Sequence, residues 1–276
     1  MTRCRDLRGL WFSAPAAVVY LPLIAIPLAY SLYLSFHYWD GRAPSWTTAG
    51  IGNYLDMVKD KVFWRSLAHN LVLVAFSLAV QLPVAMLLAV LLERTRRLDG
   101  FMRTCIFLPY VLPTVVIALV WRSLITASAP EWLASPDWSL SAILLAVTWR
   151  FIGFLTVLYL AGLGMIDRQL YEAARIDGTS EWQCFRHITL PLMKPVIIVS
   201  ATLAIVGSMK YFDIVFLMTG GDPDHATELL ATYLFKMGFV HDRMGYSSAI
   251  AVALVLLALG TTVIMLQLKR WSDRRQ

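Results

Sequence analysis

Long apolar runs without charge are the feature that most constrains the fold of this chain. Four such runs cover residues 9–36, 66–92, 104–121 and 244–268. Each one reaches the roughly 18 residues that mark a helix able to cross a bilayer. Two further runs, 138–166 and 195–221, are interrupted by Arg150 and by Lys210 and Asp213. Because 58% of the 276 residues are hydrophobic and only 15% are charged, a soluble domain of this size is excluded.

We therefore expect an all-α polytopic membrane protein with six transmembrane helices, organised as a single domain over residues 1–276. The expected spans lie at about 10–36, 66–92, 104–126, 138–166, 192–218 and 244–268. We interpret the first run as a retained span. It is far longer than the ~7–15 residues of a signal-peptide core, and no clear cleavage site follows it.

Basic residues are distributed unevenly between the two sides of the expected membrane domain. The two termini together with segments 93–103 and 167–194 hold 15 of the 24 lysines and arginines, and the alternate loops hold 6. The positive-inside rule then places both termini and segment 167–194 in the cytoplasm. Cys4, Cys105 and Cys184 lie on that same side, where thiols stay reduced, so no disulfide is expected. Since the basic residues are split among four short segments, the net charge of +6 does not indicate nucleic-acid binding.

A polar insert at 167–191 separates the fourth and fifth expected spans. Its residues predict two short helices joined at a glycine. Asp167 can cap the first helix, Gly178 stands where a left-handed helix terminus favours glycine, and Ser180 with Gln183 forms a capping box for the second helix. A helical hairpin with a face of small residues is typical of a docking element. On these features alone, an ordinary cytoplasmic loop is an equally good interpretation.

The order of residues within the insert resembles the EAA loop of ABC importer permeases. The matching positions are Glu172, Ala173, Ala174, Asp177, Gly178, Ile188, Leu190 and Pro191. Three further segments resemble the same points of maltose-type carbohydrate permeases: the start of the second span, the FLP of the third span, and the FD…TGG that ends the fifth. The resemblance covers most of the chain, and it is closest to the MalF-like inner-membrane component.

This resemblance implies a permease subunit of an ATP-driven importer, with the eight matching residues coupling it to ATPase subunits through a cytoplasmic coupling-helix loop. It implies a sugar or sugar-like solute, a second permease subunit, two ATPase subunits and an extracytoplasmic solute-binding protein. It also implies a multi-pass location in the cell (inner) membrane, in contact with lipid. The chain has no phosphate-binding GxxxxGK[ST] loop. We therefore expect no enzyme activity, metal or cofactor on this chain, with ATP and Mg bound by the partner ATPase subunits.

The charges deepest in the expected spans are candidates for the solute path. A charged side chain at the bilayer centre costs ~2.5–3.5 kcal/mol on insertion scales, so Arg150 should face the protein interior or a water-filled cavity. The candidate path residues are Trp149, Arg150, Lys210, Tyr211 and Asp213. Two structural alternatives stay open. Lys210 and Asp213, three residues apart, can pair on one helix, and Arg150 can join them in an ion-pair network.

The alternative function is a secondary, ion-coupled solute transporter. Such a protein needs its own coupling-ion site and an internal repeat. Asp213 is the only carboxylate well inside an expected span, and the sequence holds no second copy of the insert. The permease interpretation is therefore favoured.

Overall fold

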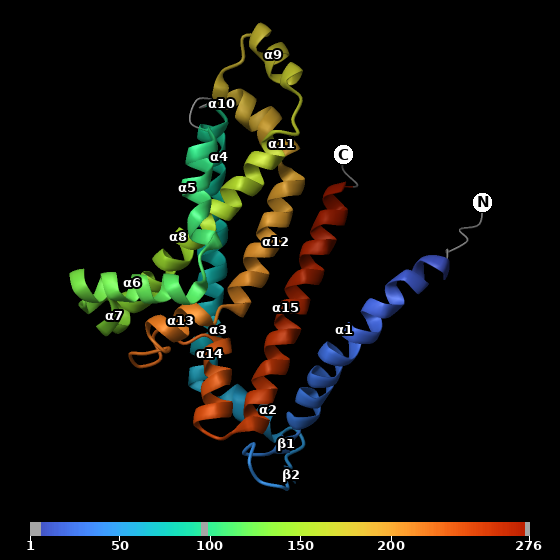
Figure 1. The fold of residues 1–276 in the computed structure, drawn as a ribbon, viewed down its shortest axis with the longest axis vertical. Helices are drawn as coiled ribbons and strands as arrows, with labels where there is room; N and C mark the ends of the chain where they lie inside the picture. The colour runs from blue at the N-terminus through green and yellow to red at the C-terminus, as the bar shows by residue number, and fades with distance from the viewer. Residues whose placement is uncertain (1–6, 95–98, 274–276) are drawn as a thin grey trace. The chain divides into compact units, whose positions relative to one another are not determined.

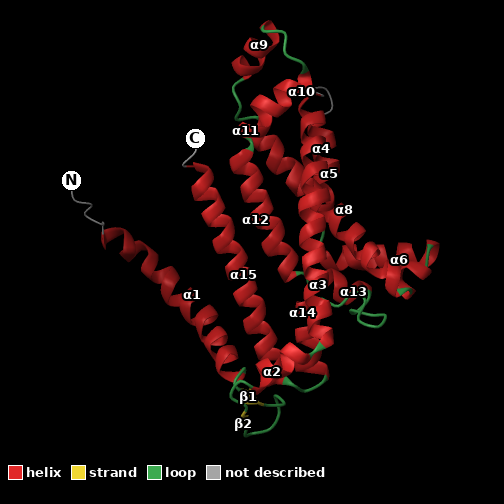
Figure 2. Ribbon diagram, turned by 180° about the vertical axis from the view of Figure 1, so that it is seen from behind, coloured by secondary structure: helices red, strands yellow, loops and turns green. Residues whose placement is uncertain are grey.

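The computed structural model describes residues 7–94 and 99–273, and these residues are mostly helical (Figures 1 and 2). Helix α1 (Leu7–Leu34) precedes an antiparallel hairpin of β1 (His37–Tyr38) and β2 (Thr47–Thr48). The helices from there to the insert are α2 (Gly52–Lys59), α3 (Lys61–Phe76), α4 (Leu82–Arg94), α5 (Asp99–Val111), α6 (Thr114–Ser128), α7 (Glu131–Ala134) and α8 (Pro136–Leu163). The helices from the insert onward are α9 (Arg168–Ile176), α10 (Glu181–Cys184), α11 (Leu190–Leu192), α12 (Lys194–Lys210), α13 (Asp213–Met218), α14 (Leu230–Phe235) and α15 (Met244–Asp273). Three π-helical turns join successive helices: η1 (Ser77–Gln81), η2 (Phe185–Thr189) and η3 (Lys236–Val240).

Internal contacts divide the chain into two units, which are described separately. Unit 1 draws on residues 1–60 and 234–255, and unit 2 on residues 61–233 and 256–276. The insert and all the candidate path residues belong to unit 2.

Four helical stretches in the described residues are long and apolar enough to cross a membrane: Ala14–Leu34, Lys61–Glu93, Pro136–Leu163 and Met244–Gln267. Two bent pairs pass the same test together: Gly100–Val111 with Thr114–Ser128, and Glu181–Leu192 with Lys194–Lys210. Counting each bent pair as one span gives six. The prediction of an all-α polytopic membrane protein is therefore confirmed.

The expected continuous third span at 104–126 is wrong in its detail, because the chain turns by 94° between α5 and α6. Pro113 stands at the break with φ −55° and ψ 137°. Proline lacks the N–H that an α-helix needs, and it disfavours helical geometry in the residue before it. The expected span is thus built from two helices that point in different directions.

The expected fifth span also differs, because α12 ends at Lys210 and Tyr211 adopts an extended conformation. A new helix, α13, begins only at Asp213. Lys210 and Asp213 therefore do not lie on one helix, and the premise that they pair across one helical turn is wrong.

Helix α8 organises the packing of unit 2, since it contacts α4, α5, α12 and α13. Its first half contributes Ala142, Ile143, Ala146 and Val147 to one buried cluster, and its second half contributes Leu155, Tyr159, Leu160 and Leu163 to another. At Gly153 a Cβ atom would collide with the carbonyl of Ile106 and the Cα of Phe107. Only glycine at this position allows α5 to pack so closely against α8.

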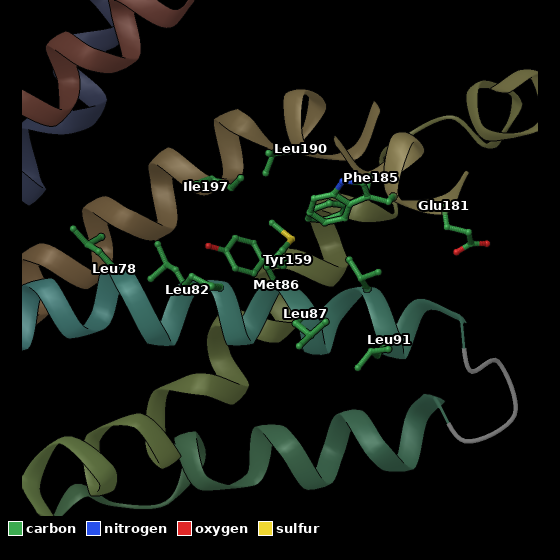
Figure 3. Close-up of a pocket in the computed structure, with 13 residues that line it drawn as sticks. Leu78, Leu82, Met86, Leu87, Leu91, Tyr159, Glu181, Phe185, Leu190 and Ile197 are labelled. Carbon is green, nitrogen blue, oxygen red and sulfur yellow. The ribbon is translucent and has the colours of Figure 1, made fainter. Parts of the chain in front are cut away.

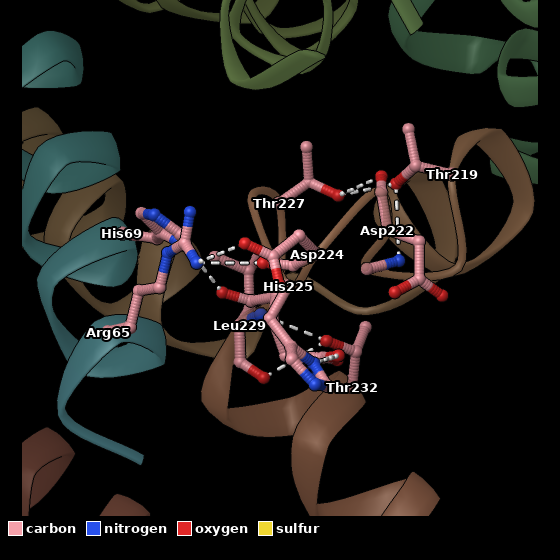
Figure 4. Close-up of polar contacts among 11 residues, drawn as sticks. Arg65, His69, Thr219, Asp222, Asp224, His225, Thr227, Leu229 and Thr232 are labelled. Carbon is pink, nitrogen blue, oxygen red and sulfur yellow. Dashed lines mark hydrogen bonds and ion pairs between the residues drawn. The ribbon is translucent and has the colours of Figure 1, made fainter. Parts of the chain in front are cut away.

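Polar contacts attach the segment after α13 to α3. Asn70 is fully buried, where it donates to the carbonyl of Ser208 and accepts from the Leu230 N–H, each at 2.9 Å. Arg65 donates to the Asp224 carbonyl at 2.7 Å (Figure 4). His69 donates to the Glu228 carbonyl at 2.9 Å. Asn70 thus faces other helices, as a polar side chain in a span must.

Candidate functional site

The insert folds as two short helices whose ends carry the expected caps. The Asp167 side chain accepts from the Gln169 N–H at 3.0 Å, which starts α9. At α10, Ser180 accepts from the Gln183 N–H at 3.3 Å, and the Gln183 side chain accepts from the Ser180 N–H at 2.7 Å. This reciprocal pair confirms the predicted capping box.

The turn between the two helices depends on Gly178, which has φ +75°. No atom lies within 4 Å of the position where its Cβ would be. The requirement for glycine is therefore one of backbone conformation and not of space. The Thr179 N–H then donates to the Ala174 carbonyl at 3.1 Å, which closes the end of α9.

Helix α9 lies at the tip of unit 2 (Figure 1) and has no buried residue. Glu172, Ala173 and Asp177 are exposed, and the Ile176 side chain next to them is 86% exposed. Helix α9 thus presents charged, small and apolar side chains together on one open tip.

The rest of the matching residues lie at the base of the insert. Ile188 is half-buried in the π-helical turn η2, and Leu190 and Pro191 form the first turn of α11. The chain bends by 67° between the helical segment Glu181–Leu192 and α12, Lys194–Lys210. The structure therefore separates the eight residues into a group at the tip, from Glu172 to Gly178, and a group that links the insert to a membrane helix.

Sequence reasoning missed the contact that joins tip and base. The Tyr171 hydroxyl lies 2.8 Å from Thr189 Oγ1, and Arg175 lies 3.9 Å from Glu181. Burial raises the pKa of Tyr171, because it disfavours the charged phenolate. Tyr171 and Thr189 are 18 residues apart and follow no periodic pattern, so no local signal pointed to their pairing.

An apolar cavity of about 550 Å³ lies beside the base of the insert (Figure 3). It is lined by Leu82 and Met86 of α4, by Tyr159 of α8, and by Phe185 and Leu190. Leu190 thus belongs both to the matching residues and to this groove. The wall offers few convergent polar groups, so it is unsuited to a hydroxyl-rich ligand.

The candidate path residues centre on an aromatic cluster between α5, α8 and the end of α12. The Arg150 guanidinium lies 5.1 Å from the centroid of the Phe151 ring. Phe151 packs edge-on against Tyr211 at 5.5 Å and against Tyr110 at 5.7 Å. Tyr110 in turn stacks on Phe154 at 4.7 Å. The structure therefore brings Arg150 and Tyr211 together through Phe151, which the sequence interpretation did not include.

The other candidates lie around this cluster. Trp149 packs edge-on against Trp121 at 5.9 Å, and Lys210 and Asp213 are exposed on either side of the helix break. Within the part of the chain that the structure describes, Arg150 forms no ion pair with Asp213, and its buried Nε has no hydrogen-bond partner. The alternative of a single ion-pair network across these residues is therefore wrong.

These features define a class of protein: a polytopic helical membrane subunit that exposes a capped helical hairpin and holds an unpaired cation among aromatic rings. Residues 81–276 match the family model described as "Binding-protein-dependent transport system inner membrane component". The chain belongs to this family.

Several curated proteins are similar over almost the whole chain. The probable ABC transporter permease YurN of Bacillus subtilis (strain 168) is 31% identical, covering 91% of this chain and 92% of YurN. The lactose transport system permease LacF of Rhizobium radiobacter is 30% identical, with 100% and 97% covered. The trehalose/maltose transport system permease MalF of Thermococcus litoralis is 31% identical, with 93% and 92% covered.

The fold is similar to that of a bacterial ABC transporter involved in the import of the acidic polysaccharide alginate. The TM-score is 0.77 at 21% identity, with 98% of this chain and 96% of that chain covered. The chain is thus a multi-pass membrane permease subunit of a binding-protein-dependent importer, and ATP hydrolysis belongs to a separate subunit. The secondary-transporter alternative is excluded.

Proposed function

We propose that this permease carries a sugar or a sugar-like solute across the cell (inner) membrane, after delivery by an extracytoplasmic solute-binding protein. Support comes from the relatives whose names specify lactose and trehalose or maltose. It also comes from the aromatic cluster of Tyr110, Phe151 and Tyr211, because aromatic faces pack against the C–H faces of sugar rings.

The importer contains a second permease subunit together with two ATPase subunits. Both termini and the insert lie in the cytoplasm, as the distribution of basic residues predicts. ATP and Mg bind to the ATPase subunits, and this chain holds no cofactor. The exposed faces of the membrane helices contact lipid and the second permease subunit.

The tip of the insert couples the membrane helices to the ATPase. Glu172, Ala173, Ala174 and Asp177 form its contact face, and Gly178 sets the turn behind it. Motion at the tip passes through the Tyr171–Thr189 contact to Ile188, Leu190 and Pro191, and from there into α12. The supporting observation is continuity, since the base residues lead directly into a membrane helix.

Arg150 and Tyr211 contact the solute, and Trp149, Lys210 and Asp213 line the approach to it. The single observation that carries this assignment is the Arg150 guanidinium, which lies over Phe151 with its Nε buried and unpartnered. A cation in a membrane span needs an interacting group. Among the described residues the Arg150 guanidinium forms no ion pair, so we assign a solute hydroxyl or anionic oxygen as its partner during transport.

The test is uptake of labelled lactose, maltose and trehalose by cells that express the intact importer with Arg150→Gln. Glutamine keeps a hydrogen-bond donor but removes the charge. We expect normal assembly and a change in KM of about tenfold, equivalent to ~1.4 kcal/mol. Arg122→Gln is the matched control, since Arg122 also lies in an apolar helix but contacts the Leu217 carbonyl. Wild-type uptake of every solute by the Arg150→Gln importer would remove Arg150 from the path.

A further inference from the structure

A cavity of about 370 Å³ lies within unit 1, and none of the path or coupling residues lines it. One wall is the turn between β1 and β2, with Tyr38, Trp39 and Asp40. The other wall is the start of α15, with Asp242 just before it and Tyr246 within it. Its volume falls within the ~300–1,000 Å³ of small-molecule sites.

The wall formed by the hairpin turn is held in one conformation by its own hydrogen bonds. The Asp40 carboxylate accepts from the N–H groups of Ala43 at 2.8 Å and Arg42 at 2.9 Å. These two bonds lower the pKa of Asp40, so the group is ionised at neutral pH. The Trp39 indole N–H donates to the Ala43 carbonyl at 2.9 Å. With its N–H occupied, Trp39 has only its ring faces and edges to offer a ligand.

Side-chain contacts also hold the opposite wall in place. Arg42 pairs with Asp242 at 2.9 Å, which joins the hairpin turn to the segment before α15. The Arg243 guanidinium lies 4.6 Å from the centroid of the Tyr246 ring. The Tyr246 hydroxyl donates to Asp60 at 2.6 Å. The tyrosine ring is therefore fixed before any ligand arrives.

Asn53, which also lines the cavity, has an acceptor that no described group satisfies. Its side chain is 1% exposed, and its Nδ2 donates to the carbonyls of Ser35 at 2.9 Å and His37 at 3.0 Å. Its Oδ1 is buried and has no hydrogen-bond partner. A buried acceptor without a donor costs roughly 1–3 kcal/mol. Because this atom is closed to solvent, Asn53 shapes the cavity wall and leaves the contacts with a ligand to the aromatic and carboxylate side chains.

Aromatic faces beside carboxylate acceptors suit a sugar ring, which alternates C–H faces with a rim of hydroxyl donors. The polar wall is unsuited to a lipid chain. The carboxylates of Asp40 and Asp242 are balanced by Arg243, which also lines the cavity, and by Arg42, which pairs with Asp242, so the site favours a neutral ligand. An interfacial aromatic belt accounts for an exposed ring such as Trp46. Trp39 and Tyr246 differ from such a ring, because each is held by a hydrogen bond beside an open hollow that carboxylates also line.

We propose that this cavity is a binding site for one neutral saccharide unit, separate from the solute path through Arg150. The site holds the sugar in a weak complex on the outer side of the membrane. The proposal takes the sugar class and the orientation of the chain from the proposed function. It does not depend on the path residues.

The test uses the complete importer in lipid nanodiscs, without binding protein or ATP, and saturation-transfer NMR with maltose as the probe. Trp39→Ala should reduce the affinity for maltose by roughly 3- to 10-fold, as the loss of an aromatic contact does. Ser45→Trp, on the exposed turn that lines the cavity, should block it without removing any internal bond. Trp138→Ala is the matched control, because Trp138 is an exposed tryptophan of unit 2.

An unchanged maltose signal in both cavity variants would overturn the proposal. Weaker association of the binding protein with an unchanged maltose signal would also overturn it, by making the cavity a protein contact. Uptake separates this inference from the proposed function. If sugar uptake depends on Arg150 and both cavity variants bind maltose normally, only the cavity site is refuted. An importer that takes up no sugar but loses its maltose signal on Trp39→Ala refutes only the transport assignment.

Discussion

At the scale of single residues, Asn70 shows how a buried polar side chain fixes the relation of three segments. Its amide joins α3 to the end of α12 and to the start of α14. Replacement by alanine leaves the Ser208 carbonyl and the Leu230 N–H buried without this partner. We expect Asn70→Ala to lower the free energy of unfolding by about 1–3 kcal/mol per stranded group.

Thermal unfolding of the purified importer in detergent measures this effect. Leu71→Ala is the control, since Leu71 is the next residue on α3 and its side chain is 53% exposed. A midpoint for Asn70→Ala equal to that of Leu71→Ala would contradict the structural role of the amide.

Single residues also show which parts of the candidate site could be predicted from the sequence. Arg150 was identifiable because a charge deep in an apolar run requires an explanation. Tyr211 was identifiable as an aromatic residue next to Lys210, another such charge. Phe151 and Tyr110 were not, because an aromatic residue in a membrane helix is ordinary, and only the fold shows that these rings meet. Asn53 gave no signal either, because the burial that leaves its Oδ1 without a described partner arises only when α2 packs in the fold.

At the scale of elements, the local signals of the insert were sufficient to predict its two helices. The hydrogen bonds of the caps at Asp167 and Ser180 and of the turn at Gly178 each join residues at most five positions apart. The rest of the fold therefore did not change these local structures. The breaks in the third and fifth spans were not predictable in the same way. Pro15, Pro22, Pro27 and Pro109 lie inside helices, whereas Pro113 stands at a break. The same residue type thus bends or continues a helix according to its packing.

The turn of the insert provides the prediction at this scale. Gly178→Leu places a branched side chain at φ +75°, where a left-handed conformation costs roughly 1–2 kcal/mol. Since the surrounding space is open, the effect should come from the backbone alone. We expect weaker recovery of the ATPase subunits with the permease and lower transport-stimulated ATPase activity.

Gly178→Asn is the control, because asparagine tolerates the left-handed region better than leucine does. Its activity should lie between those of the wild type and Gly178→Leu. Full stimulated activity and full complex yield in Gly178→Leu would refute a coupling role for this turn.

At the scale of the whole molecule, this chain is apolar on surfaces that it does not bury itself. Only 6% of the α1 span and 11% of the Met244–Gln267 span are buried within the chain. Helices that are hydrophobic all round belong in lipid or against another subunit. The exposed apolar surface agrees with a permease that works within a larger importer. The direction in which the chain inserts into the membrane is the property to test at this scale.

The orientation prediction follows from the basic residues and can be tested with thiols. Cys184 lies in the insert and is half-buried, Cys105 is exposed on α5, and Cys4 lies outside the described residues. A membrane-impermeant maleimide added to intact cells should label none of them, while permeabilised cells should show labelling of Cys105 and Cys184. Ser45→Cys in a variant without the native cysteines places a thiol on the exposed hairpin turn, and it should be labelled in intact cells. If Cys184 reacts in intact cells while the thiol at position 45 requires permeabilisation, the positive-inside argument fails for this chain. The insert could then no longer contact a cytoplasmic ATPase.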